Sequence, residues 1–146
     1  MAFAMKMNFV PVLVDGSLRH LYVDGQRAGF QVEARLGYYR GHYLSDIDEF
    51  WISVDGVKYD PVVTTFGING KDIPATMLNR CASEFWTLLE PAKIKVTLPG
   101  GIADGTHKVD LHLMLRVPYL PLPGGDSDHS YMPLDSCGTA DLIIHD

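Results

Sequence analysis

The chain has little of what usually identifies a protein class at first sight. It contains only two cysteines, Cys81 and Cys137, outside any C-x-x-C pair, so two reduced thiols are favoured over a disulfide or a cysteine metal site. Cys137 does not begin a helix, the setting that commonly lowers a thiol pKa. Residues 1–16 are interrupted by charges and Pro11, which predicts neither a signal peptide nor a membrane span. We therefore expect a soluble, cytoplasmic protein.

Basic runs are also missing. The 12 Lys and Arg residues are scattered, and the formal net charge is -6. Because a surface that follows nucleic-acid phosphates concentrates positive charge, we expect no nucleic-acid partner. A chain of 146 residues suits one domain spanning 1–146. Such a domain buries about two thirds of its unfolded surface and needs no disulfide or metal to fold.

Standard catalytic and metal-binding signatures are absent. There is no G-x-S-x-G elbow, and no Gly-rich loop opens a long helix. His107 and His112 fall on opposite faces of a predicted strand, without a His-x-His pair or adjacent glutamate for a cupin-type metal site. Asp126, Asp128 and Asp135 lack the spacing of an EF-hand loop. The residues thus predict no metal site, and His112 is expected to be a solvated or inter-sheet polar residue.

What the chain does contain is the pattern of short antiparallel strands. Asp-Gly pairs recur between stretches rich in Val, Leu, Ile, Phe and Tyr, as in turns that join strands. The predicted strands are 10–14, 18–23, 29–36, 48–54, 57–66, 86–98 with a break near Pro91, 106–117 and 141–144. A short helix is predicted over 74–82. The chain therefore predicts an all-β fold, an antiparallel, jelly-roll-like β-sandwich with one short helix.

The first group of candidate contact residues precedes strand 48–54. Its members are Tyr38, Tyr39, Arg40, His42 and Tyr43. Tyrosine and arginine are common anchors of protein interfaces, and histidine changes its charge near neutral pH. We expect the cluster to be exposed and to serve a protein contact rather than catalysis, with His42 as the candidate base in the catalytic case.

The second candidate group lies in residues 118–137, which are rich in Pro, Gly, Asp and Ser and predict a long loop. Loops of this length are usually functional. Its candidate partner or substrate contacts are Asp126, Asp128, His129 and Tyr131.

Several motifs resemble the small (β) subunit of bacterial C-glycoside deglycosidases. They are YYRGHYLSDIDEFWISVDG at 38–56, Asp72-Ile73-Pro74, LPGGIADGTHKVDL at 98–111, Arg116-Val117-Pro118-Tyr119 and YMPLDSCG at 131–138. The resemblance spans most of the chain from about Arg35 onward, and the order and spacing of the motifs carry it together.

The resemblance implies an accessory subunit of a carbon–carbon lyase, inactive when isolated. In that family a larger (α) subunit resembles xylose isomerase, a TIM barrel that holds a divalent metal, manganese, and αβ pairs form higher-order assemblies. The complex cleaves 3-oxo-C-glycosides of flavonoids and other polyphenols by β-elimination. The resemblance implies no cofactor bound by this chain, and no catalytic residue is carried over to it.

Two other functions stay open from the residues. One is a stand-alone carbohydrate-binding sandwich in which Tyr38, Tyr39, Trp51 or Trp86 stacks on a sugar; the lack of a predicted signal peptide weighs against it. The other is a single-chain hydrolase or isomerase with His42 as base, which requires activity without a partner. An obligate subunit should expose a larger apolar patch than a lectin-like module.

Overall fold

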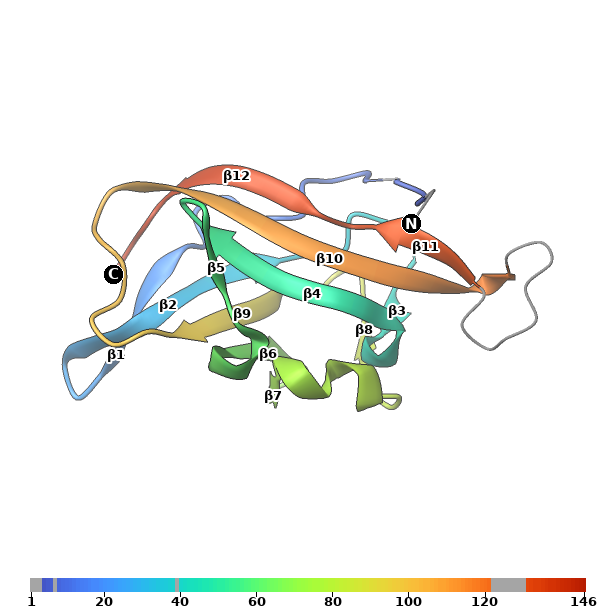
Figure 1. Ribbon diagram of the computed structural model, residues 1–146, viewed down its shortest axis with the longest axis horizontal. Coiled ribbons are helices and arrows are strands. Elements are labelled where there is room, and N and C mark those ends of the chain that lie inside the picture. The colour runs from blue at the N-terminus through green and yellow to red at the C-terminus, as the bar shows by residue number, and fades with distance from the viewer. Residues whose placement is uncertain (1–3, 7, 39, 122–130) are drawn as a thin grey trace.

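Two antiparallel β-sheets pack face to face in the computed structural model, which describes residues 4–6, 8–38, 40–121 and 131–146 (Figure 1). The first sheet has the spatial order β1 (Arg19–Val23), β2 (Gln26–Ala34), β9 (Ala92–Thr97), β6 (Thr64–Ile68) and β7 (Lys71–Pro74). The second has the order β11 (Tyr131–Asp135), β10 (Thr106–Pro121), β4 (Ile47–Val54) and β5 (Val57–Tyr59). The predicted all-β sandwich is confirmed.

The long strand β10 organises the second sheet. One of its edges pairs with β4, and the other pairs first with β12 (Gly138–Ile143) and then with β11. A separate two-stranded ladder of β3 (His42–Tyr43) and β8 (Phe85–Trp86) lies beside the N-terminal start of β4 (Figure 1). Residues 136 and 137 therefore lie at the break between β11 and β12, opposite the middle of β10.

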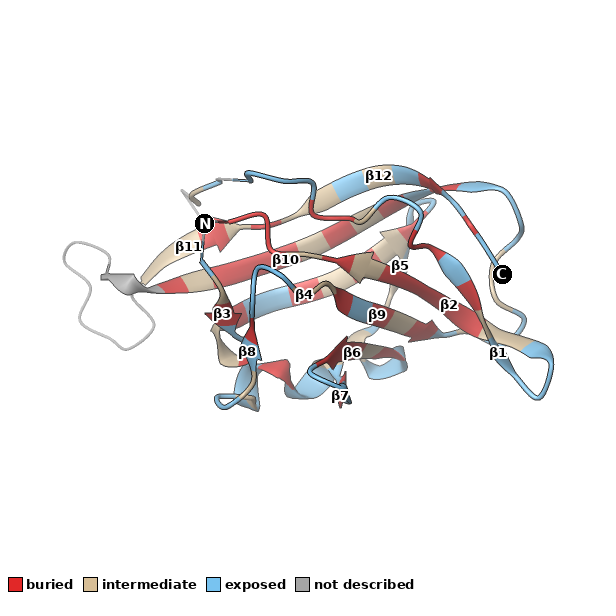
Figure 2. Ribbon diagram, turned by 180° about the vertical axis from the view of Figure 1, so that it is seen from behind, coloured by how far each residue is buried: buried red, intermediate tan, exposed pale blue. Residues whose placement is uncertain are grey.

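The core lies between the two sheets, and buried residues alternate with less buried ones along strands such as β9 (Figure 2). Along β10, the predicted alternation is confirmed, because the inward residues are at most 2% exposed: Val109, Leu111, Leu113, Leu115 and Val117. Aromatic pairs join the sheets, with Phe30 and Tyr59 at 5.3 Å and Phe50 and Phe66 at 5.6 Å between ring centroids. This period of two fixes which side chains of β10 point outward.

Two predicted strands differ from the observed ones. Residues 10–14 form an isolated bridge between Leu13 and Ala34 in place of a strand, since Pro11 has no N–H to donate to a ladder. Residues 57–66 divide into β5 and β6, separated by the 3-10 turn η2 (Pro61–Val63). The Asp60 carboxylate accepts a hydrogen bond from the Val62 N–H and caps this turn.

Helical structure is limited to short 3-10 segments in the described residues. The helix predicted over 74–82 is the 3-10 segment η3 (Ala75–Arg80), ended by a bond from the Cys81 N–H to the Leu78 carbonyl. A further turn, η1 (Leu44–Asp46), joins β3 to β4. None of the helical segments in the described part of the chain has the length and hydropathy of a membrane span.

Candidate functional site

The first candidate cluster is divided between the interior and the surface. Tyr38 and His42 are buried, at 4% and 2% exposed, whereas Arg40 and Tyr43 are exposed. His42 and Tyr43 point to opposite sides because they are successive residues of β3, and His42 pairs with Trp86 of β8. The expectation that the whole cluster is exposed is therefore wrong for Tyr38 and His42.

His42 lies beneath the surface that Tyr43 helps to form. Its ring centroid is 5.8 Å from that of Tyr38, and its Nδ1 is 3.6 Å from Asp46 Oδ2. Within the described part of the chain, neither ring nitrogen has a hydrogen-bond partner. Its role as a base stays a hypothesis, since a substrate would have to reach an interior position.

The exposed side of this end of the sandwich carries an apolar patch. We define it by the exposed apolar side chains of the β3–β8 ladder and of the turn that follows β8: Tyr43, Phe85, Leu88 and Leu89. Tyr43 and Phe85 meet edge to face with centroids 4.9 Å apart, and Leu89 is 94% exposed. The Trp86 Nε1–H donates to the Glu90 carbonyl at 2.8 Å and so fixes the turn that carries Leu89. Exposed aromatic and aliphatic side chains gathered on ordered backbone are typical of protein interfaces.

The second candidate segment is partly a β-hairpin, so the prediction of a loop throughout 118–137 is wrong. β10 continues to Pro121, which pairs with Tyr131, the first residue of β11. Pro133 is tolerated because β11 pairs with β10 on one side only, apart from the bridge to Met5, and Pro118 and Pro121 lie beyond Leu115, the last residue of β10 that pairs with β4. Tyr131 is half-buried. The remaining candidates, Tyr39, Asp126, Asp128 and His129, lie outside the described residues.

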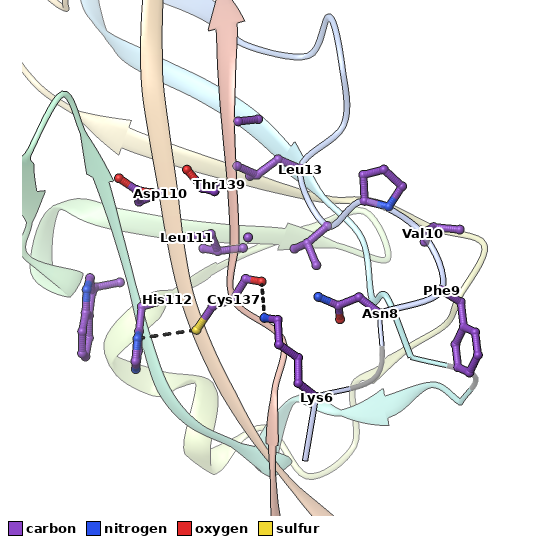
Figure 3. A pocket seen from close by; sticks show the side chains of 15 residues that line it. Lys6, Asn8, Phe9, Val10, Leu13, Asp110, Leu111, His112, Cys137 and Thr139 are labelled. Atoms are coloured by element: carbon purple, nitrogen blue, oxygen red, sulfur yellow. Dashed lines mark hydrogen bonds between the residues drawn. The ribbon is translucent and has the colours of Figure 1, made fainter. Parts of the chain in front are cut away.

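A groove of about 770 Å³ lies where β11 ends and β12 begins, between the N-terminal segment and β10. Cys137 and His112 line it, and the Sγ of Cys137 lies 3.6 Å from Nδ1 of His112 (Figure 3). Nε2 of the same ring lies 2.8 Å from Oε1 of Glu49. The structure thus brings together a carboxylate, an imidazole and a thiol in sequence, from β4, β10 and the β11–β12 break. We call this set the Glu49–His112–Cys137 relay.

Trp51 holds the imidazole of the relay in place. The rings of Trp51 and His112 are stacked at 3.7 Å between centroids with an angle of 6°, and Lys58 Nζ lies 3.9 Å from the Trp51 centroid. Two groups so close to one ring centroid must occupy opposite faces. Both faces of Trp51 are therefore covered, and the stacked imidazole cannot rotate freely about its own side-chain bonds.

The relay was missed in the sequence because each member alone is an ordinary residue. The alternation of 48–54 places Glu49 and Trp51 on one face, and the alternation of 106–117 places His112 on the outer face of β10. The missing information is the register, in which His112 pairs with Trp51, so that Glu49 is diagonal to it. Correct pairing of these two strands would have predicted the His112 contacts on β4.

A second histidine–carboxylate pair closes the turn after β4. His107 Nδ1 lies 2.5 Å from Asp55 Oδ2, and Nε2 lies 2.6 Å from the Ala103 carbonyl. Burial alone would lower the pKa of His107, but the two acceptors outweigh it and raise the pKa. The His107 hydrogen bond, followed by that of the Lys108 N–H, lowers the pKa of Asp55. Both shifts favour the charged pair.

We expect His107→Gln to remove a pH-dependent part of the stability. A raised histidine pKa stabilises the fold below the unfolded value of about 6.5, and this contribution is lost as the pH rises through the folded pKa. A lowered aspartate pKa stabilises the fold above the unfolded value of about 3.9, and this contribution is lost as the pH falls through the folded pKa. In denaturant unfolding, the difference in the free energy of unfolding between wild type and variant should therefore be larger at about pH 5 than at about pH 8. Equal differences at the two pH values would contradict the charged His107–Asp55 pair.

The described residues do not fit a metal site. No three of their His, Cys, Asp or Glu side chains are grouped to hold an ion. The ring nitrogens of His112 are already directed at Glu49 and Cys137. No step that involves a metal is therefore assigned to the described part of this chain.

Fold and surface together define the class of protein: an antiparallel β-sandwich that exposes an interface-like apolar patch and a groove containing an imidazole and a thiol. Residues 10–119 match the family described as C-glycoside deglycosidase beta subunit. The chain belongs to this family.

Two curated relatives agree with this assignment. A C-glycoside deglycosidase beta subunit from Eubacterium cellulosolvens is 34% identical over 98 residues, which cover 67% of this chain and 67% of the relative. A 3'-dehydrocarminate deglycosidase beta subunit from a Microbacterium species is 32% identical over 105 residues, covering 71% of this chain and 76% of the relative. The resemblance read from the motifs is confirmed.

Proposed function

We propose that this chain is the β subunit of a heteromeric C-glycoside deglycosidase and contributes to activity only in complex with a larger α subunit. The observation that carries the proposal is the family match over residues 10–119, which includes β3, β4, β8 and most of β10. The names of both relatives support it, because each is a β subunit of a deglycosidase.

The proposed reaction is a β-elimination on a 3-oxo-C-glycoside of a polyphenol. The ketone at sugar C3 acidifies the proton at C2, a base removes that proton, and the bond from C1 to the aryl carbon breaks. The products are the aglycone and an unsaturated keto sugar. Negative charge develops on the ketone oxygen and must be stabilised by a positioned group. We assign the base and this group to the α subunit, proposed to be a xylose-isomerase-like TIM barrel that also holds manganese.

The apolar patch is the surface that we propose to contact the α subunit. Polar groups border it: Asn69 Nδ2 donates to the Phe85 carbonyl at 3.2 Å, and Lys71 pairs with Glu84 at 2.7 Å. An apolar centre with a polar rim is the usual composition of a stable interface. Arg40 and Tyr43 come from the first candidate cluster and are exposed at this end, which supports the prediction that the cluster serves a protein contact.

The structure offers less support for a carbohydrate-binding module. Stacking on a sugar requires a free aromatic face, but Trp86 is fully buried, Tyr38 is 4% exposed and Trp51 is covered on both faces. Three of the four aromatic side chains predicted to stack are thus not open platforms. The fourth, Tyr39, lies outside the described residues.

Co-purification tests the proposal at the level of assembly. This chain, tagged, is co-expressed with a xylose-isomerase-like candidate α subunit, and the complex is analysed by size exclusion with light scattering. We expect both chains in one peak with a fixed ratio that persists after dilution. Elution of this chain as a free monomer that binds C-glycosides would instead favour a binding module.

A further inference from the structure

The Glu49–His112–Cys137 relay has the order of a base-assisted nucleophile. The Glu49 carboxylate can only accept a hydrogen bond, so Nε2 of His112, at 2.8 Å, carries the proton of the neutral ring. This tautomer leaves the lone pair of Nδ1 directed at the Cys137 Sγ, 3.6 Å away. The carboxylate therefore prepares the imidazole to accept the thiol proton, which is the function of the third member in a nucleophile–base–carboxylate arrangement.

The surroundings of the sulfur favour reaction through a protonated thiol. Burial, the largest effect, raises the pKa of Cys137, and the nearby Asp135 carboxylate also raises it. The Leu113 N–H, which donates to Sγ at 3.4 Å, and the Lys6 ammonium act in the opposite direction without overcoming burial. A resting thiolate is thus disfavoured, and a nearby base has a proton to remove as a bond to sulfur forms.

We propose that the relay makes Cys137 a site of covalent addition to α,β-unsaturated carbonyl compounds that enter the groove. The Sγ–carbon bond forms at the β carbon, and the π electrons of the alkene move toward the carbonyl oxygen. The thiol proton passes to His112 Nδ1 and then to the α carbon. The step has no leaving group and no oxidant, and all atoms of both reactants remain in the adduct.

The groove suits an electrophile that is partly apolar and carries oxygen. Its volume of about 770 Å³ admits a small molecule, and its lining combines Phe9 and Val10 with the polar Thr139. Lys6 Nζ donates to the Cys137 backbone carbonyl at 3.2 Å, so a cation lies at the backbone of the reacting residue. The elimination proposed above releases an unsaturated keto sugar of this chemical class; only this choice of natural electrophile rests on the proposed function.

The test measures alkylation of the full chain by acrylamide, a slow unsaturated carbonyl compound, with peptide mass spectrometry reporting both thiols. Cys81 is the internal reference, because its thiol donates to the backbone carbonyl of Met77 and not to an imidazole. At about pH 7 we expect Cys137 to react faster than Cys81, and His112→Gln to slow Cys137 by on the order of tenfold or more. Glu49→Gln, which can still accept from Nε2, should slow it less than His112→Gln.

The pH profile separates base assistance from simple thiol ionisation. The charged groups around the relay are Lys6, Glu49, Lys58, Asp110 and Asp135. A rate assisted by the imidazole base is already high near neutral pH, whereas a rate that needs thiol ionisation rises only toward alkaline pH, because burial raises the pKa of Cys137. We expect the first profile in wild type and the second in His112→Gln.

Coinciding pH profiles for wild type and His112→Gln would overturn the proposal, and so would a Cys137 that reacts no faster than Cys81. The second comparison uses the wild-type chain alone, so it is decisive even if the variant folds poorly. Since alkylation is read on the full chain without substrate, its outcome is independent of any deglycosidase activity.

Discussion

Replacing Trp86 by alanine should lower the free energy of unfolding by about 3–5 kcal/mol, the usual cost of removing a large aromatic side chain from a core. Trp86 is fully buried, and its ring packs edge to face on Phe66 at 5.1 Å between centroids. Its Nε1–H also binds the Glu90 carbonyl. The substitution leaves a cavity beneath the apolar patch and frees the turn that carries Leu89. We therefore expect binding of the α subunit to be lost as the stability falls.

Urea unfolding followed by circular dichroism measures this effect. Leu89→Ala is the matched control, because Leu89 lies on the same turn and is 94% exposed, so the change should cost at most about 0.5 kcal/mol. Trp86→Phe should fall between the two, since it keeps a ring but loses the hydrogen bond. A loss below about 1 kcal/mol for Trp86→Ala would mean that the β3–β8 end does not belong to the cooperative core.

Leu89→Asp should weaken binding of the α subunit by about 30-fold or more, while the isolated chain keeps its fold. An exposed side chain contributes little to folding, but the few residues that dominate the centre of an interface each contribute about 2 kcal/mol or more to binding. A carboxylate in that position would also be buried without a partner. The effect follows from the proposal that the apolar patch contacts the α subunit.

Val23→Asp is the control for this prediction. Val23 is also apolar, is 63% exposed, and ends β1 at the opposite end of the sandwich from β3 and β8 (Figure 1). Surface plasmon resonance with immobilised α subunit should show wild-type affinity for Val23→Asp and a faster off-rate for Leu89→Asp. If Val23→Asp alone weakens binding, the interface lies at the β1–β2 end.

Local patterns predicted the sheets well where one side of a strand is buried. In residues 106–117 the strict alternation allowed only one set of side chains to face the core, and β10 has that arrangement. The strand predictions for residues 10–14 and 57–66 were wrong for a shared reason, because Pro11 and Pro61 interrupt apolar runs that otherwise favour strands. An apolar composition indicates burial, but pairing also needs backbone donors.

The candidate sites were less predictable because they depend on contacts between distant residues. His42 lies two residues after the exposed Arg40, and only its pairing with Trp86 shows that its side chain turns inward. Glu49 and Cys137 reach His112 from positions 63 and 25 residues away in the chain. Neither separation is a recognised motif, so the relay emerges only once β4, β10 and the β11–β12 break are placed together.

The most direct test of the central claim is aglycone release from a 3-oxo-C-glycoside, followed by chromatography, with this chain alone, the α subunit alone and an equimolar mixture. We predict release only by the mixture, saturating at a fixed ratio of the two chains and lost when a chelator removes the manganese that we propose for the α subunit. Release at the same rate by the α subunit alone would contradict the account, because the β subunit would then contribute nothing to the reaction.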